Sequence, residues 1–213
     1  MIHLLIAEVT LLLVSLLGIA FNLIAILTVV KTKYLHNTFG ALCVSLAVSN
    51  LGICLIFFGW CAIVPLTVHY SERDDDIGKI VGQNKNKISL FVFYGGVFTH
   101  LAVSFNRMIF FLFPLTYFIM FDFRKSAALL FALWICAAVQ VTPYFWRREC
   151  YFAFNFDDAI WYLADTECGR FLGLYFDFVP SMVVVVSILT MDTIALLKLR
   201  STHKVISKFR HQI

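Results

Sequence analysis

Long uncharged apolar runs alternate with short polar segments along the whole chain. Each run is close to the 20 residues that a helix needs to cross the hydrocarbon core of a bilayer. We therefore expect an all-α fold, a multi-span transmembrane helical bundle at residues 1–198. The predicted spans are about 5–30, 38–64, 87–113, 125–146 and 170–198, and residues 199–213 form a basic cytoplasmic tail or the start of a third cytoplasmic loop.

The third run, from Ile88 to Pro114, contains no Asp, Glu, Lys or Arg before Arg107. As a helix, Ile88 to Arg107 covers roughly 28 Å, which places this arginine near one membrane face. A charge among apolar residues there is costly and suggests a functional site. An arginine at a helix end can also simply extend its charged group to the interface. The pattern alone leaves both interpretations open.

Composition places the chain in the membrane. Hydrophobic residues make up 61% and charged residues 14% of the sequence, whereas soluble domains are nearer half apolar and a quarter charged. The lipid bilayer is therefore the expected environment. No basic run with interleaved aromatic residues suggests a nucleic-acid partner.

Polar residues inside the first two predicted spans indicate contacts between helices. Asn22 lies in the first span, and Ser49 and Asn50 lie in the second. Amides and hydroxyls in a membrane interior usually hydrogen-bond across helices, so we expect an interhelical polar cluster here, with ion binding as the alternative. The acidic run 72–76 indicates a solvated loop, and no metal or other cofactor is predicted.

The distribution of charge predicts an orientation. Lys31, Lys33, Arg124 and the tail carry bases with almost no acids, so these segments should be cytoplasmic. The N-terminus is then extracellular and the C-terminus cytoplasmic, in a multi-pass protein of the plasma membrane. Cysteines in the extracellular loops can oxidise. Cys150 and Cys168 flank one such loop, and Cys61 is an alternative partner for either.

Catalytic patterns do not support an enzyme. The sequence contains no G-x-S-x-G, H-E-x-x-H or C-x-x-C. Asp177 and Asp192 are the two carboxylates within an apolar span, and on one helix they lie about 22 Å apart, too far to share a proton. A transporter should show paired half-sequences, and no convincing repeat is present. A receptor or a structural membrane protein remains.

Several weak motifs stand in a suggestive order: Gly18 with Asn22, Ser49-Asn50, Asn106-Arg107, Trp134 and a proline in the last span. Their order resembles the rhodopsin-like G-protein-coupled receptors, and still more closely the nematode serpentine chemoreceptors of class X (Srx). Further positions that carry the resemblance are Phe39-Gly40-Ala41-Leu42-Cys43, Pro65, Gly82-Gln83, Phe113-Pro114, Pro143-Tyr144-Phe145, Cys150-Tyr151-Phe152, Trp161, Cys168, Tyr175 with Asp177-Phe178, and Lys198-Leu199.

The resemblance implies a chemosensory receptor that senses a small extracellular molecule and signals to a heterotrimeric G protein. Arg107, with Asn106, would be the switch for G-protein coupling. An acid usually precedes this arginine in the wider family, and Asn106 cannot form the resting ion pair. The usual cysteine at the outer start of span three is also missing, so the resemblance favours a Cys150–Cys168 disulfide.

A ligand pocket should open outward between the spans. Six residues are expected to line it because of their depth along the predicted helices. Most of them are aromatic, which suits a small organic molecule of unknown identity. No acid lies in the upper part of span three, which argues against a simple amine. The nominated residues are Ser89, Phe93, Tyr94, Phe98, Phe176 and Asp177.

Receptors of this kind have seven helices, and the sequence predicts five, with helices 6 and 7 absent. Two hypotheses follow. The chain is a chemosensory receptor, or a truncated form of one. Alternatively, it is a signalling-incompetent five-span membrane protein that associates with full-length receptors in an oligomer.

Overall fold

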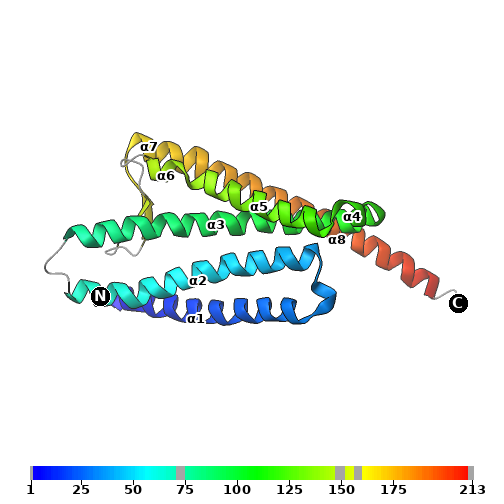
Figure 1. Ribbon diagram of the computed structural model, residues 1–213, viewed down its shortest axis with the longest axis horizontal. Coiled ribbons are helices and arrows are strands. Elements are labelled where there is room, and N and C mark those ends of the chain that lie inside the picture. The colour runs from blue at the N-terminus through cyan, green and yellow to red at the C-terminus, as the bar shows by residue number, and fades with distance from the viewer. Residues whose placement is uncertain (1, 71–74, 147–151, 156–159, 211–213) are drawn as a thin grey trace.

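The computed structural model describes the backbone of residues 2–70, 75–146, 152–155 and 160–210. Helices dominate this part of the chain (Figure 1). In chain order the elements are α1 (Ile2–Lys31), η1 (Lys33–Leu35), α2 (Thr38–Tyr70), α3 (Asp75–Leu112), α4 (Pro114–Met120), α5 (Phe123–Val141), α6 (Pro143–Trp146), β1 (Phe152–Asn155), β2 (Ile160–Leu163), α7 (Glu167–Phe171), η2 (Leu172–Phe178) and α8 (Val179–Arg210).

Within the described residues, five helical stretches are long and apolar enough to cross a membrane. This result confirms the predicted multi-span helical bundle. The stretches alternate in direction, so that η1 and α4 lie at one end of the molecule and α7 at the other (Figure 1). The five stretches are Val9–Lys31, Thr38–Gly59, Lys87–Leu112, Arg124–Phe145 and Glu167–Thr202.

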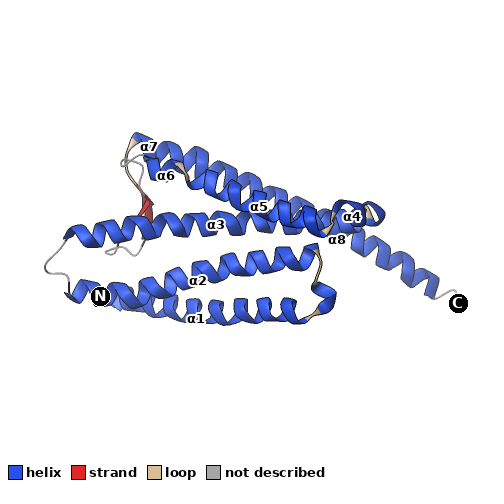
Figure 2. Cartoon of the chain, in the orientation of Figure 1, coloured by secondary structure: helices blue, strands red, loops and turns tan. Residues whose placement is uncertain are grey.

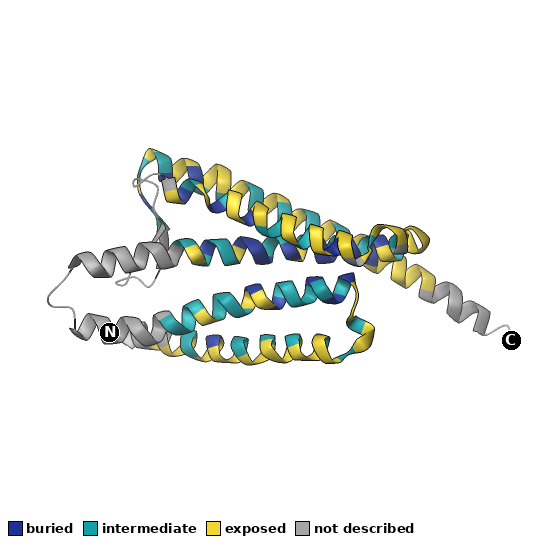
Figure 3. Cartoon of the chain, in the orientation of Figure 1, coloured by how far each residue is buried: buried dark blue, intermediate teal, exposed yellow. Residues whose placement is uncertain are grey.

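Helix α3 is the centre of the bundle. It contacts α2, α5 and α8, while α1 packs against α2. In the third spanning stretch, 44% of the most apolar 18-residue segment is buried inside the protein. The corresponding share is 17% or less in each of the other four stretches. Buried positions accordingly run along α3, and the outer helices expose most of their apolar surface (Figure 3). Helix α3 therefore carries most of the contacts that hold the bundle together.

Two glycines allow the neighbouring helices to approach α3 closely. A Cβ at Gly95 would lie 2.6 Å from the ring of Trp134 in α5, and a Cβ at Gly96 would lie 2.6 Å from the hydroxyl of Ser49 in α2. Small residues at such positions bring membrane helices close enough for interhelical hydrogen bonds. The same region of α3 therefore contacts α2 and α5 at once.

A short β-hairpin joins α6 to α7, and the sequence analysis did not predict it. Strands β1 and β2 pair antiparallel with Phe152 opposite Leu163 and Asn155 opposite Ile160. Aromatic and β-branched residues favour strands, and the sequences FAFN and IWYL are rich in them. The hairpin lies beside α3 at the α7 end (Figure 2). We call this end the hairpin end and the opposite one the α4 end.

The last spanning helix begins irregularly. Its segment η2 is a π-helix that ends just before Pro180. Proline has no N–H and cannot continue the backbone hydrogen-bond ladder at its position. The side-chain amide of Gln140 in α5 donates a hydrogen bond to the Phe176 carbonyl of this segment. Single-turn π-helices inside longer helices often mark functional sites.

Candidate functional site

At the hairpin end, side chains from α3, α5, α6 and η2 form a buried cluster, which we call the hairpin-end cluster. Phe91, Phe98, Leu163 and Cys168 pack against it from partly exposed positions. Four separate segments of the sequence therefore meet at one place, as expected for a site between helices. The buried members are Leu90, Tyr94, Ala137, Val141, Tyr144 and Leu172.

Tyr94 and Asp177 form the central polar contact of this end. The Tyr94 hydroxyl donates a hydrogen bond to the Asp177 carboxylate, which joins α3 to the π-helix η2. Tyr94 is only 2% exposed. Its ring stacks on Phe98 at 6.1 Å between centroids and meets Phe93 edge-on at 5.5 Å. The structure thus brings together four of the six residues nominated for a ligand pocket.

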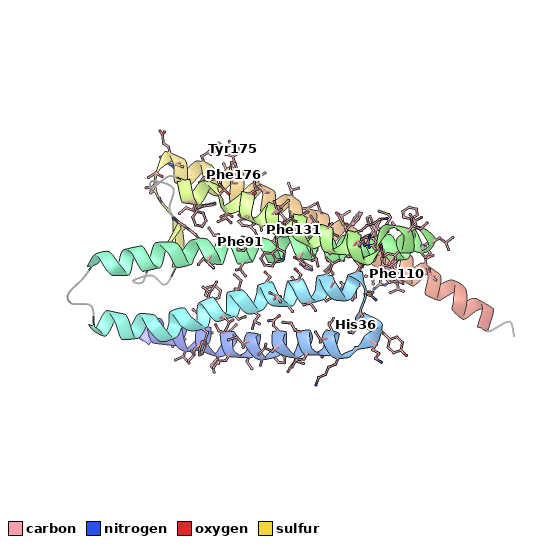
Figure 4. All side chains as sticks on the ribbon, viewed as in Figure 1. His36, Phe91, Phe110, Phe131, Tyr175 and Phe176 are labelled. Atoms are coloured by element: carbon pink, nitrogen blue, oxygen red, sulfur yellow. The ribbon has the colours of Figure 1, made fainter. Side chains whose placement is uncertain are left out.

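The other two nominated residues lie near this group without joining it. Ser89 is half-buried on α3. Phe176 contributes its carbonyl to the bond with Gln140, and its ring lies 6.2 Å from that of Phe171. Phe176 and Tyr175 lie at the hairpin end, whereas Phe110 and His36 lie at the α4 end (Figure 4).

Tyr144 is a residue of this end that the sequence analysis used only for the resemblance. It is 2% exposed and belongs to the same buried cluster as Tyr94. Within the part of the chain that the structure describes, its hydroxyl has no hydrogen-bond partner. Most buried hydroxyls have one, so this group needs an explanation. The sequence gives no signal for it, because burial of Tyr144 depends on how α6 packs against side chains of α3 such as Leu90 and Tyr94.

A polar layer at mid-depth joins α2, α3 and α5. The indole N–H of Trp134 donates to the Ser45 hydroxyl at 3.1 Å, and Ser45 pairs with Thr99 at 3.2 Å. Ser49 donates to the Val92 carbonyl at 2.5 Å. Such interhelical bonds stabilise membrane bundles.

The predicted cluster of Asn22, Ser49 and Asn50 has a different arrangement. Asn22 donates to the Gly18 carbonyl of its own helix at 2.7 Å, and Asn50 is exposed. No hydrogen bond joins the three among the described residues. Position i−4 on the same helix is always within reach of an asparagine, so Asn22 satisfies its amide locally. Ser45 and Ser49 provide the contacts from α2 to α3.

At the α4 end, Arg107 and Asn106 point in different directions. Arg107 is exposed, with its guanidinium carbon 5.5 Å from the centre of the Phe39 ring. Asn106 is 2% exposed, and its amide lies 3.4 Å from the Tyr117 hydroxyl of α4. No ion pair holds Arg107 in the described ranges. Its charge therefore faces outward, free of an acidic partner there.

Helix α4 presents exposed apolar side chains at the same end of the molecule as Arg107 (Figure 1). Leu115 is 85% exposed, and Ile119 is also exposed. The Lys125 ammonium donates to the Ile119 carbonyl at 2.7 Å, which ties α4 to the start of α5. The sequence analysis assigned no element to this segment, which lies between the third and fourth predicted spans. Pro114 is the sequence feature that could have indicated this helix, because proline favours the first helical position.

The cysteines are described only in part. Cys168 is disulfide-bonded, while Cys43, Cys54 and Cys136 are free thiols. Cys150, the predicted partner of Cys168, lies outside the described residues, so the pairing stays a prediction.

Five membrane-spanning helices, with α3 at the centre, form a multi-pass membrane protein that has polar contacts at both ends of α3. A family model described as serpentine type 7TM GPCR chemoreceptor Srx matches residues 12–212. The match covers most of the chain, and the chain belongs to this family of chemoreceptors. A search of curated proteins found no match. Family and fold together point to a receptor and away from an enzyme.

Proposed function

We propose that the chain senses a small extracellular molecule at the hairpin end and signals to a heterotrimeric G protein at the α4 end. The observation that carries this proposal is the position of two residues on the most buried helix. Tyr94 lies in the hairpin-end cluster and Arg107 lies at the α4 end, about 20 Å further along α3. One rigid element thus connects the two sites.

The α4 end supports a protein partner. Arg107 offers an exposed cation, and Leu115 and Ile119 of α4 offer exposed apolar surface at the same end. Arginine and buried apolar anchors supply much of the binding energy in protein interfaces. Asn106 has no charge with which to hold Arg107 in a resting ion pair, so the arginine is available before any ligand binds.

Charge supports the orientation. Lys31, Lys33, Arg124 and Lys125 all lie at the α4 end, where the turns between α1 and α2 and between α3 and α5 are found (Figure 1). The positive-inside rule then makes this end cytoplasmic and the N-terminus extracellular. The hairpin end consequently faces the ligand.

Ligand binding would act through the Tyr94–Asp177 bond, which joins α3 to η2. A ligand that binds one arrangement of these helices better than another shifts the population toward it. At the other end of α3, the Asn106–Tyr117 contact and the exposed Arg107 would report that shift to the G protein. The alternative of a signalling-incompetent partner of full-length receptors is not favoured by the family match.

The test is nucleotide exchange on a purified G-protein heterotrimer, with the chain reconstituted in lipid nanodiscs. The unmodified chain should accelerate exchange without ligand, because Arg107 is not held by an ion pair. Arg107→Leu should abolish the acceleration, while Arg124→Leu, which removes another base at the same end, should keep most of it. No acceleration by the unmodified chain with any tested Gα class, or equal loss in both variants, would overturn the proposal.

A further inference from the structure

We infer that the hairpin-end cluster binds the ammonium group of a small arylalkylamine, with Asp177 as its counter-charge. This inference rests on the proposed chemoreceptor function and names the ligand class for that site. Three independent features carry it. They are the uncompensated carboxylate, the unpartnered hydroxyl of Tyr144, and the aromatic surroundings of Tyr94.

The carboxylate of Asp177 has one partner among the described residues, the Tyr94 hydroxyl. An ionised carboxylate can accept about four hydrogen bonds, so most of its capacity is unused. The nearby bases do not pair with it. Lys87 lies over the Phe145 ring at 4.9 Å, and Arg170 is exposed on α7. Charges within membrane spans are usually paired, and a cationic ligand would supply the missing charge.

The Tyr144 hydroxyl is the second feature. It is buried in the same cluster as Tyr94 and has no partner in the part of the chain described. Its oxygen can accept a hydrogen bond, and an ammonium group has several to donate. Tyr144 shares its cluster with Tyr94, whose hydroxyl bonds to Asp177, so we place the ammonium group between the Tyr144 and Asp177 oxygens. A carboxylate ligand could not bind there, because it would meet the charge of Asp177.

Aromatic rings surround these polar groups. Tyr94 contacts Phe93 and Phe98, and Phe91 lies 5.3 Å from Trp134 between ring centroids. Rings attract cations through their faces and bury the apolar part of a ligand. The combination fits an aromatic ring joined by a short chain to an amine.

The sequence analysis argued against an amine because span three has no acid in its upper part. That argument did not consider an acid reaching span three from another helix. The structure places the acid of η2 against α3, through the Tyr94 bond. The π-helix that carries Asp177 ends two residues before Pro180, and Gln140 donates a hydrogen bond to its Phe176 carbonyl. This irregular turn sets the direction of the carboxylate.

The experiment compares amines with alcohols of the same shape. The probes are 2-phenylethylamine with 2-phenylethanol, tyramine with tyrosol, and tryptamine with tryptophol, each titrated onto the nanodisc-embedded chain by equilibrium dialysis. At least one amine should bind at least about tenfold more tightly than its alcohol, as expected for a desolvated charge pair. Asp177→Asn should remove that preference, and Tyr144→Phe should weaken amine binding several-fold. Asp192→Asn, further along α8, should change nothing.

Thermal melting of each variant controls for folding. Should Asp177→Asn melt early, Tyr144→Phe provides the second test, because it removes only a hydroxyl and should weaken binding of the amine more than binding of the matching alcohol. Equal affinity for amine and alcohol, no binding of any amine, or unchanged amine binding in Asp177→Asn would overturn the inference. None of these results changes the outcome of the ligand-free exchange assay on Arg107. The proposed ligand class can therefore be wrong while the proposed receptor function stands.

Discussion

The side-chain amide of Gln140 donates a hydrogen bond to the carbonyl oxygen of Phe176, four residues before Pro180. The contact joins α5 to the π-helix η2 beside Asp177. A backbone irregularity in a membrane span is tolerated where a neighbouring helix satisfies the freed group. Gln140 therefore supports the turn that directs Asp177 toward Tyr94.

Replacing Gln140 with leucine should destabilise the bundle. The Phe176 carbonyl would lose its donor, and interhelical hydrogen bonds in membranes are worth about 1–2 kcal/mol. Thermal melting in detergent should detect the loss as a lower midpoint. Thr142→Val is the control at the end of the same helix, since the Thr142 hydroxyl bonds to the Ala138 carbonyl of α5 and not to η2. An equal drop in both variants would contradict this role for Gln140.

Gly95→Ala should destabilise the polar layer at mid-depth. The added methyl would lie 2.6 Å from the Trp134 ring, which donates to Ser45 and so ties α5 to α2. Overpacking of this kind costs about 1–3 kcal/mol. Gly59→Ala is the control, because nothing lies within 4 Å of its added methyl. The melting midpoint should fall for Gly95→Ala and stay level or rise for Gly59→Ala. The reverse order would show that α3 and α5 do not pack as described.

The exposed guanidinium of Arg107 predicts the effect of an acid beside it. Asn106→Asp should attract Arg107 and lower ligand-free nucleotide exchange by about two- to fivefold, the range of a partly exposed ion pair. The Tyr117 hydroxyl, 3.4 Å from the Asn106 amide, would still have an oxygen to donate to. Asn106→Leu should leave exchange near its original level or raise it. A rise in exchange with the aspartate would argue against Arg107 as the switch.

Cys168 should be linked to Cys150. Peptide mapping by mass spectrometry under non-reducing conditions should recover that pair. Cys168→Ser should lower stability by about 2–4 kcal/mol. Cys136→Ser, which removes an exposed free thiol, should have no such effect. Recovery of Cys168 linked to Cys61 would replace the predicted pairing with the alternative that the sequence leaves open.

The sequence predicted the spanning helices because a bilayer restricts the backbone conformations that can cross it. An uncharged run such as the one before Arg107 must form a helix there, since lipid cannot satisfy a bare backbone. The same run placed Arg107 at the end of α3. The family resemblance, carried by motifs from Gly18 to Lys198, is confirmed by the match over residues 12–212.

Lateral packing could not be predicted in the same way. Hydrophobic runs that face lipid on one side and protein on the other show little periodicity, so the sequence does not say which faces meet. For this reason the Tyr94–Asp177 bond, the buried Tyr144 hydroxyl and the Gln140–Phe176 contact were not foreseen. Asn22 was expected to reach across the bundle and instead bonds to its own helix. The strands β1 and β2 fell in a loop whose aromatic residues were not considered as strand formers.

The central claim is that α3 connects a ligand site at the hairpin end to a G-protein site at the α4 end. Hydrogen–deuterium exchange of the nanodisc-embedded chain, with and without nucleotide-free G protein, tests it without a ligand, because coupling between two sites is reciprocal. The account predicts altered protection in α4 and also in η2 (Leu172–Phe178), with both changes lost in Arg107→Leu. A change confined to α4, or none at either end, would contradict it.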